Sequence, residues 1–495
     1  MKFIGRKREL QALDHFYNTA EAGLLILFGR RRVGKTSLLT HFIENRKISG
    51  GFYWMATTHN TTYQLRDFSQ ALFTYDPRFT SAPQADFSFP DWEAALNYLA
   101  DSVAQFSTPQ LIVIDEFTYL IRNEPALISL VQKLWDHRLS KMSSLRLVLT
   151  GSLVGMLERE VISYQAPLYG RATSLLRLRP LPYAAIIELF RDRMSDERVA
   201  IYAATGGVPA YLNLFTRTNT FVSALHNECL IPGSIMLGDP ALMLHEQLKE
   251  PQTYESILSS IASGFHKWSE IAQLSGVAET SLGHYLRILE ELELIERRDP
   301  LFALPTGRQG KYYLRDHFLQ FYYRFIVPHL SKIDRGYLDV AVEQIYKDLR
   351  SFIGTYVFEE LCREWTLSAG VAGQLDFEPE MVGSYWQQHR GKGVQLDIVA
   401  ANKRQKKLLI GEAKWGKESV SRSILTDLIQ RSQRMPQVKE GWNVQYILFS
   451  REGFTAATKE MSEALGVRLL TLSEMEEALV NVYERYNLPT STAAS

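Results

Sequence analysis

Nearly uninterrupted apolar runs mark three segments in the first part of the chain. They span residues 24–28, 111–114 and 145–149, and each is bounded by polar residues or glycine. Such runs are typical of strands that are buried on both faces of a parallel sheet. We therefore predict a parallel α/β domain over residues 1–155.

Farther along the chain, from residue 252, the apolar positions recur with helical spacing. They follow i, i+3, i+4 and i+7, and Gly276 marks a turn. This pattern predicts three short helices in helix-turn-helix order: 254–261, 268–272 and 281–292. Two short strands separated by a glycine-containing loop then predict a wing: 294–298 and 311–314. We expect a winged helix with an aromatic connector over residues 249–330.

A second pair of apolar runs lies near the C-terminus. Residues 395–401 and 407–415 flank a polar, basic turn, which is typical of a β-hairpin. We assign this hairpin to an α/β domain over residues 340–482, followed by a tail over 483–495.

Composition narrows the class of protein. The 55 basic residues balance the 55 acidic ones, so any surface that binds nucleic acid must be local. Two cysteines, Cys229 and Cys362, are too few for a disulfide framework or a cysteine zinc site, which suits a reducing compartment. The N-terminus lacks the apolar segment of a signal peptide, and no apolar run approaches the ~20 residues that span a bilayer. We expect a cytoplasmic protein without a membrane partner.

The strongest chemical signal follows the first apolar run. Residues 29–36 match G-x-x-x-x-G-K-T and lead into a helical segment. In such a loop the glycines let backbone N–H groups surround phosphates at a helix N-terminus, the lysine reaches the β/γ-phosphates and the hydroxyl binds Mg²⁺. The residues that we assign to an ATP and Mg²⁺ site are therefore Gly29, Gly34, Lys35, Thr36 and Ser37.

The second apolar run ends in two carboxylates, Asp115 and Glu116. A buried parallel strand delivers such groups to the carboxyl edge of its sheet. We expect Asp115 to hold Mg²⁺ and Glu116 to orient or deprotonate the attacking water. The third run ends near Thr150 and Ser152. Either hydroxyl could sense the γ-phosphate or simply form a strand-to-helix turn, and we rank Ser152 first.

With these motifs the chain resembles a family of archaeal and bacterial AAA-type ATPases, related to origin-binding and STAND signalling NTPases, that often carry a nuclease-like C-terminal domain. Residues 3–10 are similar to the G-R-x-x-E-L box, which implies that Arg6 lies near the adenine. Residues 167–171 are similar to a G-R element, which implies that Arg171 is an arginine finger in cis or from another subunit, and this role would favour a homo-oligomer. A surface or salt-bridge arginine is the alternative. Residues 205–209 are similar to the G-x-P element of a helical lid, which we place at 156–248.

The charges of the predicted winged helix favour two different roles. Its third helix region carries four glutamates against Arg287 and His284: Glu279, Glu290, Glu291 and Glu293. Repulsion from phosphates makes this helix unsuited to a DNA groove. The wing is basic instead: Arg297, Arg298, Arg308 and Lys311. DNA contact by the wing and docking against another domain both remain open.

Three charged groups are expected to converge at one end of the C-terminal hairpin. Glu412 and Lys414 share a face of their strand, and a turn centred near Arg404 places Asp397 opposite Gly411 or Glu412. Two carboxylates and an amine can bind Mg²⁺ or Mn²⁺ and position water to attack a phosphodiester. A surface ion pair is the alternative.

This hairpin resembles that of the PD-(D/E)xK nuclease fold, although Leu396 replaces the proline before Asp397. The resemblance implies a helical glutamate ahead of the hairpin, for which we choose Glu359 as a further metal ligand. It also implies a glutamine or lysine on the following helix, where Gln430 is available. Basic residues are expected to add a phosphate-binding surface nearby: Lys403, Arg404, Lys406, Lys407, Lys417 and Arg422.

The fold predicted is thus multidomain α/β: a P-loop NTPase parallel sheet with a helical lid, a winged helix, and a C-terminal α/β nuclease-like domain. The function predicted is an Mg²⁺-dependent ATPase whose nucleotide state controls the last domain, which acts on or binds DNA. Its catalytic groups would be Glu116 and Arg171 in one site and Asp397, Glu412 and Lys414 in the other. The alternative is an ATP-dependent regulatory switch with a non-catalytic docking domain.

Overall fold

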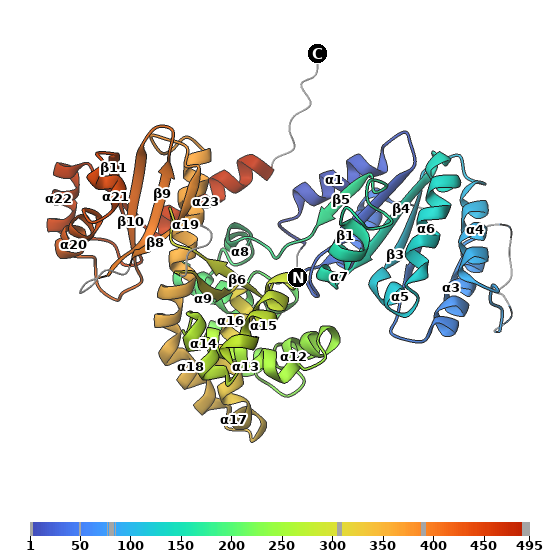
Figure 1. The fold of residues 1–495 in the computed structure, drawn as a ribbon, viewed down its shortest axis with the longest axis horizontal. Coiled ribbons are helices and arrows are strands. Elements are labelled where there is room, and N and C mark those ends of the chain that lie inside the picture. The colour runs from blue at the N-terminus through green and yellow to red at the C-terminus, as the bar shows by residue number, and fades with distance from the viewer. Residues whose placement is uncertain are drawn as a thin grey trace, which may run out of the picture. The chain divides into compact units, whose positions relative to one another are not determined.

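The computed structural model describes residues 3–48, 51–76, 78, 84, 86–303, 309–387 and 393–487. The chain forms two compact units, one from Arg6 to Pro180 and one from Leu181 onward (Figure 1). Arg308 of the predicted wing and most of the predicted tail lie outside the described residues.

A five-stranded parallel sheet organises the first unit (Figure 1). Its strand order is β2-β3-β4-β1-β5, with these bounds: β1 (Gly23–Phe28), β2 (Gly51–Met55), β3 (Gln110–Asp115), β4 (Leu145–Gly151) and β5 (Ser174–Arg177). Every pairing is parallel. Because all residues of β1, β3 and β4 are buried, the three predicted apolar runs are confirmed as strands of a parallel sheet.

Helices connect and cover these strands. They are α1 (Lys7–Tyr17), α2 (Lys35–Arg46), α3 (Thr61–Tyr75), α4 (Trp92–Val103), α5 (Phe117–Asn123), α6 (Ala126–His137), η1 (Leu139–Lys141), α7 (Val154–Leu157) and η2 (Glu158–Ile162). Residues 156–180, which the sequence assigned to the lid, instead belong to this unit, because β5 pairs with β1. β5 escaped prediction because it has only four residues, none of them fully buried.

The second unit begins with helices. They are α8 (Tyr183–Leu189), α9 (Ser195–Thr205), α10 (Pro209–Phe215), α11 (Phe221–Ala224), η3 (Leu225–Cys229) and α12 (Ile235–Gln247). α9 ends at Gly206 in the left-handed conformation, and Pro209 opens α10. A Cβ atom at Gly207 would lie 2.0 Å from the carbonyl oxygen of Leu181, so the G-G-x-P turn needs glycine there.

Three helices and a hairpin follow. They are α13 (Pro251–Ala262), α14 (Trp268–Ser275), α15 (Glu279–Glu291), β6 (Ile295–Arg298) and β7 (Lys311–Leu314), with β6 and β7 antiparallel. The helices and strands expected from the apolar periodicity are thus confirmed, and their identity as a winged helix stays a prediction.

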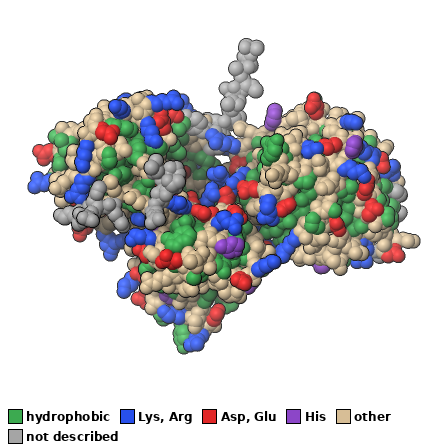
Figure 2. Space-filling view, in the orientation of Figure 1, with side chains coloured by type: hydrophobic (Ala, Val, Ile, Leu, Met, Phe, Trp, Pro, Cys, Tyr) green, Lys and Arg blue, Asp and Glu red, His purple; other side chains and the backbone are tan. Residues whose placement is uncertain are grey.

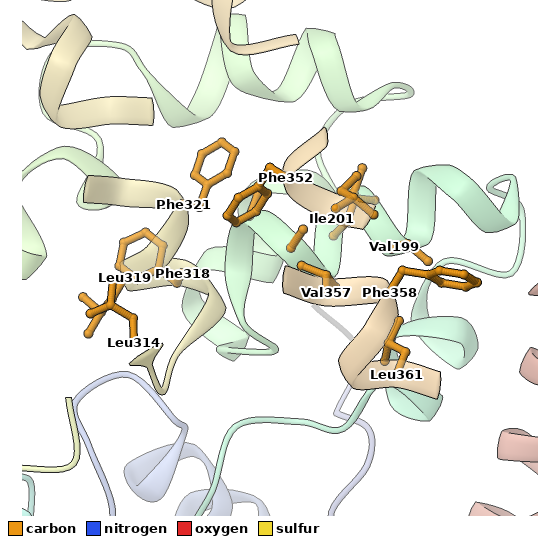
Figure 3. Packing of buried hydrophobic residues seen from close by; sticks show 14 of the residues in the cluster. Val199, Ile201, Leu314, Phe318, Leu319, Phe321, Phe352, Val357, Phe358 and Leu361 are labelled. Carbon is orange, nitrogen blue, oxygen red and sulfur yellow. The ribbon is translucent and has the colours of Figure 1, made fainter. Parts of the chain in front are cut away.

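The chain then passes through a mainly helical segment into the last sheet. The helices are α16 (His317–Phe321), η4 (Tyr322–Ile326), η5 (Val327–His329), α17 (Leu330–Asp334), α18 (Leu338–Phe352), η6 (Ile353–Phe358) and α19 (Glu359–Val371). Most of their aromatic side chains are buried together with residues of α9 and β7, as Figure 3 shows for Phe318, Phe321, Phe352 and Phe358, whereas Tyr346 of α18 is exposed. The aromatic connector is therefore core, and this core joins the predicted lid to the C-terminal domain.

A mixed five-stranded sheet forms the end of the second unit. Its order is β12-β11-β10-β9-β8, with these bounds: β8 (Met381–Gln387), β9 (Val394–Asn402), β10 (Lys407–Lys414), β11 (Asn443–Ser450) and β12 (Arg468–Thr471). β8, β9 and β10 form an antiparallel meander, and β11 pairs parallel to β10. The predicted hairpin at 395–415 is confirmed as β9 and β10.

Helices cover both faces of the mixed sheet (Figure 1). They are α19 and α23 (Leu472–Asn487) on one face, and α20 (Arg422–Ser432), α21 (Pro436–Lys439) and α22 (Ala456–Leu465) on the other. Ile398 and Phe449 pack toward α19, whereas Val399 and Leu448 pack toward α20. The alternation of β9 and β11 side chains thus fills two separate cores. Among the described helices, none combines the length and hydropathy needed to cross a bilayer.

Candidate functional site

The loop between β1 and α2 has the backbone of a phosphate-binding site. Gly34 adopts the left-handed conformation (φ 96°) and caps α2, which begins at Lys35. A Cβ atom at Gly29 would lie 2.2 Å from the carbonyl oxygen of Leu178. Glycine at these positions therefore lets the loop turn tightly and leaves the first N–H groups of α2 available to an anion.

Lys35 lies at the centre of this loop. Its Nζ donates to the carbonyl oxygen of Gly29 (2.9 Å) and to Ser152 Oγ (3.0 Å), and lies 3.9 Å from Glu116 Oε1. Burial lowers the pKa of Lys35, while Glu116 and Asp115 oppose that shift. The amine is thus held beside the two carboxylates of the β3 end, where it can meet nucleotide phosphates.

Asp115 ends β3 and is completely buried. Its Oδ2 accepts a hydrogen bond from Thr36 Oγ1 (2.8 Å) and another from the hydroxyl of Tyr53. Its Oδ1 accepts from Glu116 N (2.9 Å) and from Thr150 Oγ1. The Thr36 hydroxyl and the Asp115 carboxylate are oxygen ligands that lie side by side, so the residues present fit Mg²⁺.

Glu116 and Ser152 form the other half of the site. Ser152 N donates to Glu116 Oε2 (3.1 Å), and Ser152 Oγ also contacts the Glu116 carboxylate. Because β4 lies between β3 and β1, its end brings Ser152 between Glu116 and Lys35. Thr150 contacts Asp115 instead. Both hydroxyls that the sequence offered therefore lie in the site, with Ser152 next to the lysine.

Arg6 supports the loop from beneath. Its Nη2 donates to the carbonyl oxygen of Val33 (2.9 Å), its Nη1 pairs with Glu9 Oε1 (3.0 Å), and the side chain is buried. This contact fixes the residue before Gly34. A contact between Arg6 and adenine stays a prediction, as does one between Ser37, which is exposed on α2, and the nucleotide.

Arg171 forms an ion pair with Asp136. Its Nε and Nη2 pair with both carboxylate oxygens of Asp136 (2.7 and 2.8 Å), and its remaining hydrogen bonds to described residues go to the carbonyl oxygens of Pro167 and Tyr169. The pair is partly exposed. The pair matches the salt-bridge alternative for Arg171, because bidentate pairing to a carboxylate uses the guanidinium fork that would otherwise face a phosphate. A role as an arginine finger stays a prediction.

A second group of charged residues converges on β9 and β10. Gly411 pairs with Ile398, so continuing the register by one residue places Asp397 opposite Glu412. The register of β8 and β9 shifts at this point, from Gly383 with Val399 to Tyr385 with Leu396. Such a bulge turns a side chain away from the regular alternation. Here it turns Asp397, whose Oδ2 accepts from Ala413 N (3.3 Å).

Glu412 is enclosed by two cations. Lys414 Nζ lies 2.6 Å from its Oε1, and Arg431 Nη2 of α20 lies 2.9 Å from its Oε2. Gln430, which the sequence offered for this helix, is exposed, and its neighbour Arg431 makes the contact. The prediction of Gln430 was wrong by one residue because the helix pattern alone does not fix which side chain faces a strand end.

Glu359 opens α19 and faces the same group. Burial, and next the charge of Asp397, raise the pKa of Glu359 to about 8. Burial, and next Glu412, raise the pKa of Asp397 to about 6, with Lys414 opposing. Arg363 lies 3.6 Å from Glu359 and donates to the carbonyl oxygen of Asp397 (3.1 Å). The charges of Asp397 and Glu412 thus disfavour ionisation of Glu359, and the charge of Glu412 disfavours ionisation of Asp397.

Carboxylates with raised pKa values are suited to a cation. Asp397 and Glu412 offer oxygen ligands for Mg²⁺ or Mn²⁺, and Glu359 approaches from α19. Lys414 and Arg431 already neutralise part of this charge. Over residues 3–487 with their gaps, no group of three or more acidic, histidine or cysteine side chains has the arrangement of a complete metal site. Metal binding by these residues stays a prediction, and it would require further ligands from water or from substrate.

The basic turn lies farther from this group than predicted. Lys407 precedes Glu412 by five residues, about 16 Å along a strand at ~3.3 Å per residue. Arg404 pairs with Glu380 (3.5 Å), and Lys407 Nζ donates to the carbonyl oxygen of Asp376 (3.0 Å). Figure 2 shows basic and acidic side chains interspersed on the visible face. The turn is thus excluded from the site, whereas Lys417 lies in the loop after Lys414 and Arg422 opens α20.

The β6–β7 hairpin packs against the C-terminal domain. Arg298 Nη2 pairs with Glu360 of α19 (2.9 Å), and Lys311 Nζ lies 4.7 Å from the ring centroid of Trp386 on β8. Leu301 N, after β6, donates to the carbonyl oxygen of Ser384 (2.9 Å). Arg298 and Lys311, two of the basic wing residues, therefore make their contacts within the second unit. Of the two roles left open, this arrangement favours docking.

Two residues of these sites gave no signal in the sequence. Tyr53 lies on β2, 62 positions from the carboxylate that its hydroxyl contacts. Arg431 lies in an ordinary amphipathic helix. Tyr53 stands at an exposed position of an alternating strand, where a tyrosine is unremarkable, so only the three-dimensional pairing identifies it.

Comparison with known proteins identifies the first domain. Residues 3–215 match the family described as an ATPase domain predominantly from Archaea, and residues 322–425 match one described as archaeal and bacterial proteins of unknown function. The uncharacterized protein MJECL04 of Methanocaldococcus jannaschii is 32% identical over 433 residues, which cover 87% of this chain and 92% of that protein. The uncharacterized ATP-binding protein MJ0423 of the same organism is 54% identical over 46 residues, covering 9% of this chain and 78% of its own length.

Solved structures show more distant likeness. The Walker-type ATPase PABY2304 of Pyrococcus abyssi aligns with a TM-score of 0.47 and 20% identity, over 65% of this chain and 96% of its own. The ORC2 protein of Aeropyrum pernix, in ADPNP and ADP complexes, aligns with a TM-score of 0.43 and 14% identity, over 70% and 95%.

Proposed function

This chain belongs to the same family as MJECL04 and carries an archaeal-type ATPase domain, and on this premise we propose that it is an Mg²⁺-dependent ATPase whose nucleotide state controls a nuclease-like C-terminal domain that acts on DNA. In the proposed ATPase reaction Lys35 binds the β/γ-phosphates, Thr36 and Asp115 hold Mg²⁺, and Glu116 orients the attacking water. Mg²⁺ would supply charge stabilisation at the phosphates.

The observation that carries the nuclease-like assignment is the convergence of Glu359, Asp397, Glu412 and Lys414 at one end of the β9–β10 pair. The order of elements supports it: α19, the meander β8-β9-β10, then α20 and the parallel strand β11. In the proposed site the carboxylates bind Mg²⁺ or Mn²⁺, and Lys414 stabilises charge or orients water.

The C-terminal boundary of the matched ATPase domain supports the proposal that the ATPase controls the C-terminal domain. The match to residue 215 includes α8, α9 and α10, which belong to the second unit. Ser195 Oγ donates to Glu476 of α23 (2.7 Å), and Arg451, which follows β11, pairs with Asp196 (3.0 Å). The ATPase domain therefore contains helices that are bonded directly to the C-terminal domain.

A link to the acidic group runs through α19. Tyr202 of α9 packs on His317 with ring centroids 5.2 Å apart. Burial lowers the pKa of the partly buried His317, and the charge of Glu360 opposes this shift. Glu360 pairs with Arg298 and adjoins Glu359. A movement of the predicted lid would thus be transmitted to α19, the helix that carries Glu359. This is a physical connection, and coupling along it is what the proposal adds.

A regulatory switch with a non-catalytic docking domain is the second candidate. The observation that favours it is the neutralisation of Glu412 by Lys414 and Arg431, together with the lack of a complete metal-binding group among the described side chains. In that case ATP binding would change which partner the mixed-sheet domain holds.

The test compares the wild type with Glu412→Gln on linear and branched DNA, with Mg²⁺ or Mn²⁺ present or chelated. We expect metal-dependent cleavage by the wild type and at least a ~100-fold loss in Glu412→Gln, because removing a metal ligand removes stabilisation of developing charge. Glu418→Gln, an exposed change in the following loop, is the control. No metal-dependent product from the wild type would favour the switch.

A further inference from the structure

Tyr53 occupies an unusual position for a residue of an edge strand. It lies on β2, which forms one edge of the parallel sheet. Its neighbours Phe52 and Trp54 point into the core, whereas Tyr53 is 38% exposed. Although Tyr53 is paired with Val113 in the register, its hydroxyl reaches Oδ2 of Asp115, two residues farther along β3.

The hydrogen bonds of Asp115 are saturated. Thr36 and Tyr53 donate to Oδ2, while Glu116 N and Thr150 donate to Oδ1. An ionised carboxylate offers about four lone-pair sites, and four donors fill them. A cation can therefore approach Asp115 only when one of these donors moves.

The four donors differ in how easily they can leave. The donor from Glu116 is backbone, and Thr150 is completely buried on β4. Thr36 belongs to the helix that receives the nucleotide, and its hydroxyl is itself a predicted ligand of the ion. Tyr53 is the one whose ring is partly in solvent, on a strand with a neighbour on one side only.

We propose that Tyr53 is a positioning residue of the ATP site, which holds Asp115 in place while the metal position is empty and yields its place on Oδ2 when the metal-nucleotide complex binds. The hydroxyl thereby competes with the ion. The proposal rests on the assignment of Asp115 to metal binding and is independent of the nuclease-like domain.

Tyr53→Phe tests this competition because it removes the hydroxyl and keeps the ring. ADP binding is measured by calorimetry at a series of Mg²⁺ concentrations and in EDTA. Losing a hydrogen bond to a charged group amounts to about a tenfold change, so we expect the half-saturating Mg²⁺ concentration to fall about tenfold. ADP affinity in EDTA should stay unchanged, which also shows that the site is folded.

Tyr63→Phe is the matched control, since Tyr63 lies on α3 and is 42% exposed. It should leave both affinities as in the wild type. An unchanged or raised Mg²⁺ requirement in Tyr53→Phe would overturn the proposal. Weaker ADP binding by that variant in EDTA would overturn it as well, because the hydroxyl would then be needed for the site itself and not for the metal. Wild-type ADP binding that ignores Mg²⁺ would instead refute the metal assignment of Asp115.

Discussion

The two acidic sites of this protein differ in how their charges are compensated. In the ATP site Asp115 accepts four hydrogen bonds, and Lys35 lies between Gly29, Ser152 and Glu116. In the C-terminal site the pKa of Glu359 is raised to about 8 and that of Asp397 to about 6 by burial and by neighbouring carboxylates. The carboxylate of Asp115 in the ATP site is thus compensated by hydrogen bonds from the protein. The C-terminal site has too little positive charge nearby to compensate Glu359 and Asp397.

This difference has a consequence for ligand binding. A saturated site must release a donor before it accepts a cation, so metal binding there is linked to a local rearrangement. A site with excess acid gains directly from a cation, because the carboxylates lose their mutual repulsion. We therefore expect cation binding in the ATP site to depend on displacement of a hydrogen-bond donor, and cation binding in the C-terminal site to depend on the charge of its carboxylates.

The largest expected effect is on the ATP site. Lys35→Ala removes the amine between the carboxylates and the phosphates, and we expect ATP turnover to fall on the order of 100-fold or more. Circular dichroism should remain that of the wild type, because the loop is also held by Arg6. Lys133→Ala, an exposed lysine paired with Glu93, is the control. Phosphate release by Lys35→Ala at the wild-type rate would contradict the assignment of Lys35 to phosphate binding.

A smaller effect is expected from the excess acid on α19. Burial, and next Glu360, raise the pKa of Glu364 to about 7 from its ordinary 4.5. The folded state therefore holds this proton more tightly than the unfolded state, so the wild type loses stability as the pH rises through that interval. Glu364→Gln should abolish this loss of stability at higher pH, because glutamine does not ionise. Its urea midpoint should match the wild type near pH ~5 and exceed it at pH ~8.

Glu343→Gln, an exposed change on α18, serves as the control for Glu364→Gln. It should show no such pH dependence. A difference between Glu364→Gln and the wild type that stays constant from pH ~5 to ~8 would show that α19 carries no excess of acid at this position.

The smallest expected effect is at Arg171. Its pair with Asp136 is partly exposed, and such pairs contribute at most about 1 kcal/mol. Arg171→Ala should lower the unfolding free energy by that amount and reduce ATP turnover by less than tenfold. A loss comparable to that of Lys35→Ala would support the arginine-finger interpretation, which favours a homo-oligomer.

The sequence predicts best what is local along the chain. Residues 29–36 and the run that ends in Asp115 carry their chemistry within a few positions, so both are found on the expected strands and turns. The hairpin register that brings Asp397 opposite Glu412 also follows from the spacing around one turn.

What the sequence misses depends on pairing between distant segments. Tyr53 reaches Asp115 only because β2 lies beside β3, and Arg431 reaches Glu412 only through the packing of α20. The bulge that turns Asp397 arises between β8 and β9, which no single-strand pattern reveals. From the sequence alone, the basic turn was placed too near the acidic group. The turn joins β9 and β10 at one end, whereas the acidic residues lie toward the other end of these strands.

The most direct measurement of the central claim, that the ATP site controls the C-terminal site, is the rate of metal-dependent DNA cleavage with and without ATP. We expect ATP to change the wild-type rate at least about tenfold, and to have no effect in Lys35→Ala. Arg298→Gln, which breaks the pair with Glu360, should weaken the response to ATP while ATP turnover persists. Wild-type cleavage that proceeds at one rate whether or not ATP is present would contradict the account.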